Sequence, residues 1–160
     1  MLARIRNIIL KFRVKIAEYK HKLKINRIRR AGNIDISNSL RLFDGVKIET
    51  RYGGSIKIGE NCELLDGVLV LTYGGNIIIG NHCSINPYTI IYGHGGVSIG
   101  DNVLIAGGCM IIPSNHRFDR INIPIGQQGN TSKGIKIDDD VWIGHGCTIL
   151  DGVHIGKGCV

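Results

Sequence analysis

Long apolar runs, paired cysteines and acidic residues near the N-terminus are scarce in this sequence. After Arg4 and Arg6, the longest nearby apolar run covers only residues 8–10, which is too short for the core of a signal peptide. No run approaches the roughly 20 apolar residues of a membrane span. The five cysteines form no CxxC pair, so a zinc knuckle is not supported. We therefore expect a cytoplasmic protein whose cysteines stay reduced.

The net charge of +7 comes entirely from the start of the chain. Residues 1–30 hold eleven Lys or Arg and one acid, Glu18, whereas the remainder holds nine basic and twelve acidic residues. The body is therefore not a polycation, and we expect no nucleic-acid groove along it. With 160 residues, 43% of them hydrophobic, 23 Gly and only 3 Pro, the chain is long enough for one domain with its own core.

Residues 1–32 are predicted to be a basic amphipathic helix that ends near Gly32. Its apolar residues are spaced alternately by three and four, which forms one stripe: Leu2, Ile5, Ile9, Phe12, Ile16, Tyr19 and Leu23. Two interpretations stay open. The helix either packs across the open end of the next domain or against other copies, or it lies on an anionic membrane surface.

Residues 33–160 follow a six-residue repeat, which predicts an all-β solenoid. Aliphatic residues recur every six positions in groups of three, and each group predicts one turn of a three-sided coil. These positions are Ile36, Leu42 and Ile48; Ile58, Leu64 and Val70; Ile79, Ile85 and Ile91; Ile99, Ile105 and Ile111; Ile137, Ile143 and Ile149; and Ile155. Gly59, Gly80, Asn61 and Asn102 suit the tight corners between short strands.

Extra residues separate the groups at one corner only. Four, three, two and twenty residues are inserted after Ile48, Val70, Ile91 and Ile111. Short loops and the long loop 112–136 should therefore stack along one edge, and so long a loop in a strict repeat is usually functional or disordered. A smaller residue stands four positions after most repeat aliphatics. All five cysteines occupy this position, and we expect them in the core: Cys62, Cys83, Cys109, Cys147 and Cys159.

The repeat resembles that of the hexapeptide-repeat acyltransferases, which fold as a left-handed parallel β-helix. Four later segments are similar to the sugar O-acetyltransferases, the branch with the maltose, galactoside, capsule and lipopolysaccharide enzymes. They are YGHGG at 92–96, IGDNVLIA at 99–106, NHRF at 115–118 and DDVWIG at 139–144. The resemblance covers roughly residues 36–160. The left hand of the coil is implied by this resemblance, because periodicity alone does not give it.

The resemblance implies roles for individual residues. A His in the long loop, here His116, would take the proton from an acceptor hydroxyl, and Asn86 would orient the acceptor or the carbonyl. We predict that His94, Asn115 and Tyr92 bind the acceptor at the same edge. Asn86 directly follows a repeat isoleucine, so we expect its side chain to start at a corner and reach that edge too.

The resemblance also implies acetyl-coenzyme A as the acyl donor, held in a groove between neighbouring subunits of a homotrimer, with no metal. Trp142, Gly144 and His145 are our candidates for lining that groove. The implied function is O-acetylation of a saccharide in cell-surface polysaccharide or lipopolysaccharide biosynthesis, at the inner membrane face if the helix binds lipid. The family continues for another coil or two beyond the position of Val160, so we expect part of the coenzyme site to lie past that residue.

One histidine and one asparagine beside a groove are sufficient for this chemistry. A thioester is already activated, whereas a hydroxyl needs a base, and the pKa of histidine lies near neutral pH. An amide or backbone N–H can stabilise the oxyanion. Two alternatives stay open. One is a catalytically inactive docking solenoid. The other is a zinc enzyme resembling γ-class carbonic anhydrases, which is disfavoured because no two histidines are five residues apart.

Overall fold

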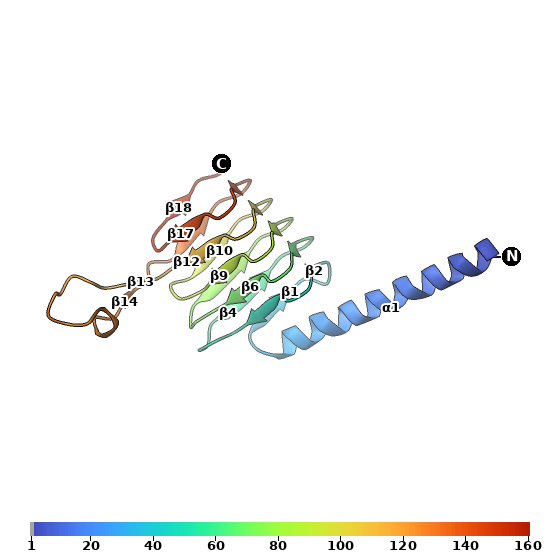
Figure 1. Ribbon diagram of the computed structural model, residues 1–160, viewed down its shortest axis with the longest axis horizontal. Helices are drawn as coiled ribbons and strands as arrows, with labels where there is room; N and C mark the ends of the chain where they lie inside the picture. Colours follow the sequence, from blue (N-terminus) through green and yellow to red (C-terminus); the bar gives the residue numbers. More distant parts are fainter. Residues whose placement is uncertain (1) are drawn as a thin grey trace.

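The computed structural model describes residues 2–160, except for the side chains of residues 2–5, 7, 8 and 17. One long helix, α1 (Leu2–Arg30), precedes a stack of short parallel strands (Figure 1). The strands form three parallel sheets with the orders β1-β4-β7-β10-β15-β18, β16-β11-β8-β5-β2 and β17-β12-β9-β6-β3. We name these sheets A, B and C. The predicted three-sided solenoid is therefore confirmed.

Each turn of the chain supplies one strand to each sheet in the order A, B, C. Sheet A contains β1 (Ile34–Ile36), β4 (Ser55–Ile58), β7 (Asn76–Ile79), β10 (Val97–Ile99), β15 (Ile135–Ile137) and β18 (His154–Ile155). Sheet B contains β2 (Arg41–Leu42), β5 (Glu63–Leu64), β8 (Ser84–Ile85), β11 (Leu104–Ile105) and β16 (Trp142–Ile143). Sheet C contains β3 (Lys47–Glu49), β6 (Leu69–Leu71), β9 (Ile90–Tyr92), β12 (Met110–Ile112) and β17 (Thr148–Leu150).

The predicted repeat positions fill the interior of the solenoid. Ile79, Ile99 and Ile137 lie side by side in sheet A and are 1–2% exposed. The register is kept across the long loop, because the chain re-enters sheet A with its repeat isoleucine pointing inward. Each fully buried isoleucine contributes about 1.5–3 kcal/mol, which explains why the repeat resumes its register after twenty extra residues.

Three of the five cysteines lie in the core as predicted. Cys62, Cys83 and Cys109 are buried and free, and each thiol donates to a carbonyl of the following coil, for example Cys109 Sγ to Gly144 O at 3.0 Å. Cys147 is half-buried and Cys159 is exposed, so the prediction of a core position is wrong for Cys159. Core burial needs a coil on both sides, and within these 160 residues no coil covers the last one.

The predicted corner residues have the expected geometry, with one refinement. Asn61 and Asn102 have φ of 55° and 57°, the left-handed region that asparagine tolerates well. Gly80 is required for a different reason, because the backbone of the next coil lies too close to admit a side chain. A Cβ there would lie 2.6 Å from Gly100 O of the next coil, closer than backbone packing allows. Gly156 occupies the same corner of the last coil, where a Cβ would meet only Cys159 Sγ at 4.0 Å.

This difference gives a stability prediction. Gly80→Ala is expected to lower the free energy of unfolding by about 1–3 kcal/mol, because two coils must move apart to admit a methyl group. The matched variant Gly156→Ala should change it by less than about 0.5 kcal/mol. Denaturant unfolding followed by circular dichroism measures both. Equal effects of the two substitutions would contradict the close backbone stacking at Gly80.

Among the described side chains of helix α1, those that pack into the solenoid core lie near its C-terminal end. Ile25 is 1% exposed and joins the core, and Ile28 packs against it partly buried. The predicted apolar stripe does not cover the open end of the solenoid, because its members between residues 9 and 23 are exposed. Leu2 and Ile5 belong to that stripe, but their side chains lie outside the described part of the chain. The domain division at residues 32 and 33 stays a prediction.

Candidate active site

The short loops between sheets C and A stack as predicted, and their aromatic rings form a column. The ring of Tyr73 lies parallel to that of His94, with 4.9 Å between centroids and 5° between planes. Tyr52 stacks on Tyr73 from the other side at 6.0 Å, and Tyr92 meets Tyr73 edge-on at 4.8 Å. We call this edge the loop corner. It brings together Tyr92 and His94, two of the predicted acceptor residues.

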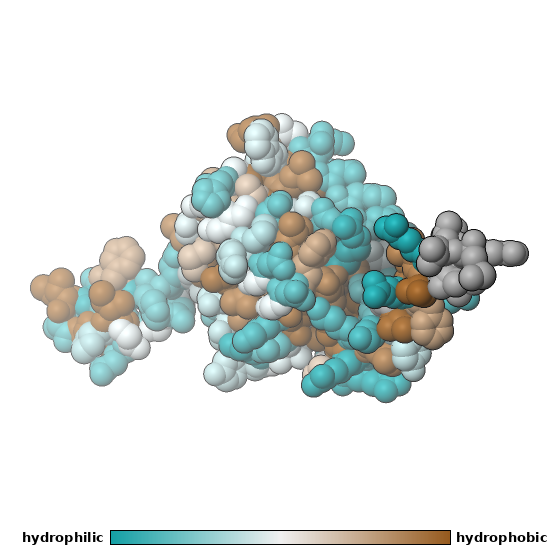
Figure 2. Space-filling view, turned by 45° about the vertical axis from the view of Figure 1, so that its right-hand side comes forward, coloured by the Kyte–Doolittle hydropathy of each residue, from teal (hydrophilic) through white to brown (hydrophobic). Residues whose placement is uncertain are grey.

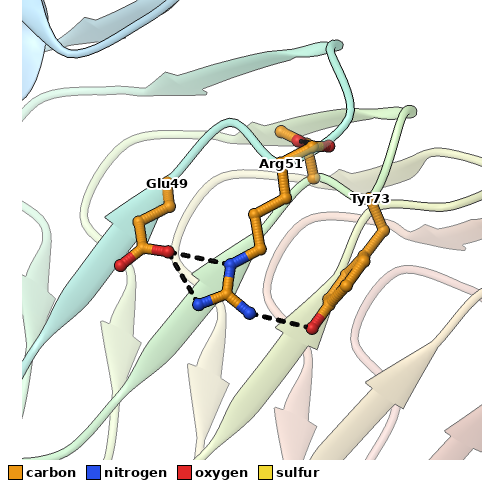
Figure 3. Close-up of polar contacts among 4 residues, drawn as sticks. Glu49, Arg51 and Tyr73 are labelled. Carbon is orange, nitrogen blue, oxygen red and sulfur yellow. Dashed lines mark hydrogen bonds and ion pairs between the residues drawn. The ribbon is translucent and has the colours of Figure 1, made fainter.

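Figure 3 shows how the column continues toward the first coils. Arg51 donates from Nε and Nη2 to Glu49 Oε2, both at 2.8 Å, and from Nη1 to the Tyr73 hydroxyl at 3.1 Å. The guanidinium thereby holds the phenol in place. Sequence reasoning placed short loops at this corner but assigned no function to Arg51, Glu49 or Tyr73. Arg51 and Tyr73 are 22 residues apart, which is one turn of the coil at this position, and this spacing is the sequence signal that places them in one column.

His94 is held as a neutral imidazole. Burial lowers the pKa of His94 below its usual value, so the uncharged form dominates at neutral pH. Its Nδ1 is buried and makes no hydrogen bond to any described residue. With Nδ1 buried, a ligand could reach Nε2, which in a neutral ring either donates or accepts a hydrogen bond according to the tautomer. This suits binding of a hydroxyl-bearing molecule better than pairing with an anion.

His116 lies at the base of an arm that projects from the loop corner (Figure 1). Two short antiparallel strands form this base, β13 (Asn115–His116) and β14 (Asn130–Thr131), with His116 opposite Asn130. The arm begins at Pro113, whose carbonyl accepts a hydrogen bond of 3.2 Å from Gly95 N. His116 is exposed, and Gly95 directly follows His94. The structure therefore places His116, Asn115, His94 and Tyr92 at the same corner.

The rest of the long loop is ordered by one buried glutamine. Gln128 is 5% exposed. Its Nε2 donates to Arg120 O and Ile123 O, both at 2.7 Å, and its Oε1 accepts from Arg120 N at 3.0 Å. Around it, a hollow of about 610 Å³ is lined partly by Phe118 and Ile125. The loop therefore forms an ordered arm. Its length alone allowed two interpretations, a functional loop or a disordered one, and the order favours the functional one.

Asn86 and the predicted coenzyme residues occupy a different part of each coil. Asn86 follows β8 at the corner between sheets B and C, where its Nδ2 donates to Ile105 O at 2.9 Å. Gly144 and His145 follow β16 at the same corner two coils later, and Trp142 projects from sheet B with 54% of its side chain exposed. We call this edge the amide corner.

The expectation that Asn86 and His116 reach one edge of the same chain is wrong. One full side of the coil, sheet C, separates their corners. A side of six residues spans up to roughly 20 Å at about 3.3 Å per residue, and the Asn86 amide is turned back onto its own solenoid. The predicted site residues therefore form two groups, one at each corner.

A shallow groove beside the loop corner was not predicted from the sequence. It has a volume of about 510 Å³, runs along the outer face of sheet A and is lined by Lys133, Lys136 and His154 among others. Asp138 pairs with Lys136 Nζ at 2.9 Å and His154 Nε2 at 2.8 Å, and these two hydrogen bonds lower the pKa of its carboxyl. Of the two lysines, Lys133 offers the groove an ammonium group for phosphates of the kind that coenzyme A carries, because Lys136 is already paired with Asp138.

The described residues contain no group of three or more His, Cys, Asp or Glu side chains that could hold a metal ion. None of the described helical residues form a helix both long and apolar enough to cross a bilayer.

Comparisons with known proteins agree with the fold and give a first indication of chemistry. No family model matches the chain. It is 44% identical over 64 residues to the probable acetyltransferase Rv3034c of Mycobacterium tuberculosis, which covers 40% of this chain. The chain spans about 21% of the length of that relative. The similarity relates the chain to an acetyltransferase, whereas the maltose and galactoside branch stays a prediction.

Two solved structures are similar in fold. A mutant of AntD, an N-acyltransferase from Bacillus cereus in complex with dTDP and coenzyme A, superposes with a TM-score of 0.55 at 22% identity, covering 78% of this chain and 67% of that one. A second AntD mutant, with dTDP-4-amino-4,6-dideoxyglucose and coenzyme A, gives a TM-score of 0.47 at 20% identity, covering 79% and 65%. At this identity, the first match supports the solenoid fold alone.

Proposed function

We propose that this protein transfers an acetyl group from acetyl-coenzyme A to a hydroxyl of a saccharide, in the biosynthesis of a cell-surface polysaccharide or lipopolysaccharide. The observation that carries the proposal is the placement of His116 on a paired hairpin at the loop corner, the same corner of the solenoid that carries Tyr92 and His94. The 64-residue similarity to a probable acetyltransferase supports acyl transfer. The proposed donor, acetyl-coenzyme A, is the one that the sequence resemblance implies, and the AntD structure of similar fold is itself a complex with coenzyme A.

In the proposed reaction, His116 acts as general base. Its exposed imidazole accepts the proton of the sugar hydroxyl while the oxygen attacks the thioester carbonyl. The new C–O bond forms, the C–S bond breaks, and the coenzyme thiolate leaves and takes up the proton. His94, Asn115 and Tyr92 hold the acceptor. Burial lowers the pKa of His94, which makes its imidazole a weaker proton acceptor, and we assign it to binding.

We further propose that each active site is assembled between two copies of the chain in a homotrimer. The supporting observation is that Asn86 lies one full side of the coil away from the corner that carries His116. A closed ring of three copies brings the amide corner of one copy against the loop corner of the next. Asn86 would then orient the carbonyl across the interface, and Trp142, Gly144 and His145 would line the coenzyme groove.

The test is release of free thiol from acetyl-coenzyme A by the full protein, assayed with a panel of neutral saccharides and amino sugars. We expect release that depends on an acceptor hydroxyl, with an ester-linked acetyl group found on the product by mass spectrometry. Release with amino sugars alone would replace O-acylation by N-acylation. If no acceptor promotes release and calorimetry detects no acetyl-coenzyme A binding, the docking-module alternative replaces the enzyme.

A further inference from the structure

The N-terminal part of α1 presents an apolar stripe that none of the described residues cover. The helix is fixed at its C-terminal end, where Ile25 is buried, Arg29 Nη1 donates to Asn38 Oδ1 at 2.9 Å and Lys24 Nζ donates to Phe43 O at 3.2 Å. From there it projects away from the solenoid (Figure 1). The stripe consists of Ile9, Phe12, Ile16, Tyr19 and Leu23, which are 41–67% exposed.

The stripe faces away from the side of the helix that packs on the solenoid. At 100° per residue, its five members fall within a sector of about 80°. Ile25, the residue that enters the core, lies about 160° from the middle of that sector. The solenoid of the same chain therefore cannot bury the stripe without releasing Ile25.

Basic side chains border the stripe on both sides. Lys15 and Lys22 lie along one border, and Arg6, Arg13 and Lys20 lie along the other. The one acid of the helix, Glu18, falls on the opposite face. Figure 2 shows hydrophobic side chains next to strongly hydrophilic ones at this projecting end of the molecule. Long basic side chains can extend past an apolar surface to reach charged headgroups, so this arrangement suits an anionic interface.

The same charges disfavour a second copy as the occupant. In a parallel coiled coil built on this stripe, Lys15 of one copy would face Lys20 of the other beside the apolar seam, and Lys22 would face Arg27. Both pairs are like-charge pairs, and the helix offers no acid at these positions. Anionic lipid provides both the apolar layer and the negative charge that the helix lacks.

We propose that α1 lies in the surface of a membrane containing anionic lipid, with the stripe inserted below the headgroups and the helix axis parallel to the bilayer. The bordering Lys and Arg contact lipid phosphates. The solenoid then stands beside the membrane, anchored through Ile25 and Arg29. This proposal rests on the helix alone and is independent of the proposed enzymatic function.

The test is co-sedimentation of the full chain with vesicles of phosphatidylcholine, with and without phosphatidylglycerol. We expect binding only to the anionic vesicles, and we expect high salt to weaken it because salt screens exposed charges. The double variant Phe12→Gln/Ile16→Gln should weaken binding by roughly tenfold or more. The matched control is Leu10→Gln/Val14→Gln, which changes two side chains of 59% and 49% exposure on the opposite face and should leave binding within about twofold.

Three results would overturn the proposal. The first is equal binding to neutral and anionic vesicles, or to neither. The second is an equal loss of binding in both double variants, because a general effect on the helix would then explain it. The third is a change in oligomeric state on Phe12→Gln/Ile16→Gln in sedimentation equilibrium without vesicles, with vesicle binding unaffected, which would assign the stripe to a second copy.

Discussion

Replacing His116 with alanine is expected to lower acceptor-dependent turnover by about 10²–10⁴-fold, the usual loss when a positioned general base is removed. The fold should survive, because His116 is exposed and its strand is held by backbone pairing with Asn130. Turnover is measured as thiol release from acetyl-coenzyme A by the full protein. Circular dichroism and thermal unfolding of the same preparation check the fold.

Two companion variants make this result specific. His82→Asn removes an exposed histidine of another corner and keeps the positive φ of 57° that asparagine tolerates, so turnover should stay unchanged. Asn86→Ala should cost less than His116→Ala, because an amide orients the reactants and carries no proton. If His116→Ala keeps turnover within a few-fold of the parent protein, the general base is a different residue, and His94 becomes the next candidate.

The fold could be predicted from the sequence because the geometry of the coil imposes the six-residue period on each of its sides. A side of the coil is one short strand and one corner, so each inward isoleucine recurs at a fixed spacing. The inward positions Ile79, Ile99 and Ile137 confirm it. The loop corner was predictable for the same reason, since all insertions follow the third side of a coil.

The errors arose where burial depends on neighbours and not on the repeat. Cys159 has the sequence context of a core residue, but a four-after position is buried only between two coils. Helix α1 enters the core through Ile25, on the face opposite the regular stripe, and a stripe alone does not reveal which face packs. The order of the long loop depends on the hydrogen bonds of Gln128. The sequence does not show that Gln128, and not the adjacent Gln127, makes these bonds.

The separation of Asn86 from His116 was available in the sequence. Asn86 follows the second repeat position of its coil and the long loop follows the third, so the two residues must lie at different corners of a three-sided solenoid. This result follows when each residue is assigned to a side of the coil, in addition to finding the six-residue period. It changes the expected site from a cluster within one chain to one that needs two copies.

A catalytic site assembled between copies is tested most directly by mixing two damaged chains. Chains carrying His116→Ala are co-expressed with chains carrying Asn86→Ala, and mixed trimers are isolated with two affinity tags. In every mixed trimer, roughly one interface in three joins an intact His116 to an intact Asn86 from the neighbouring copy. Thiol release should therefore rise well above the average of the two parent variants, to as much as roughly a third of the unmodified rate. Activity no higher than that average in stable mixed trimers would contradict a site shared between two copies.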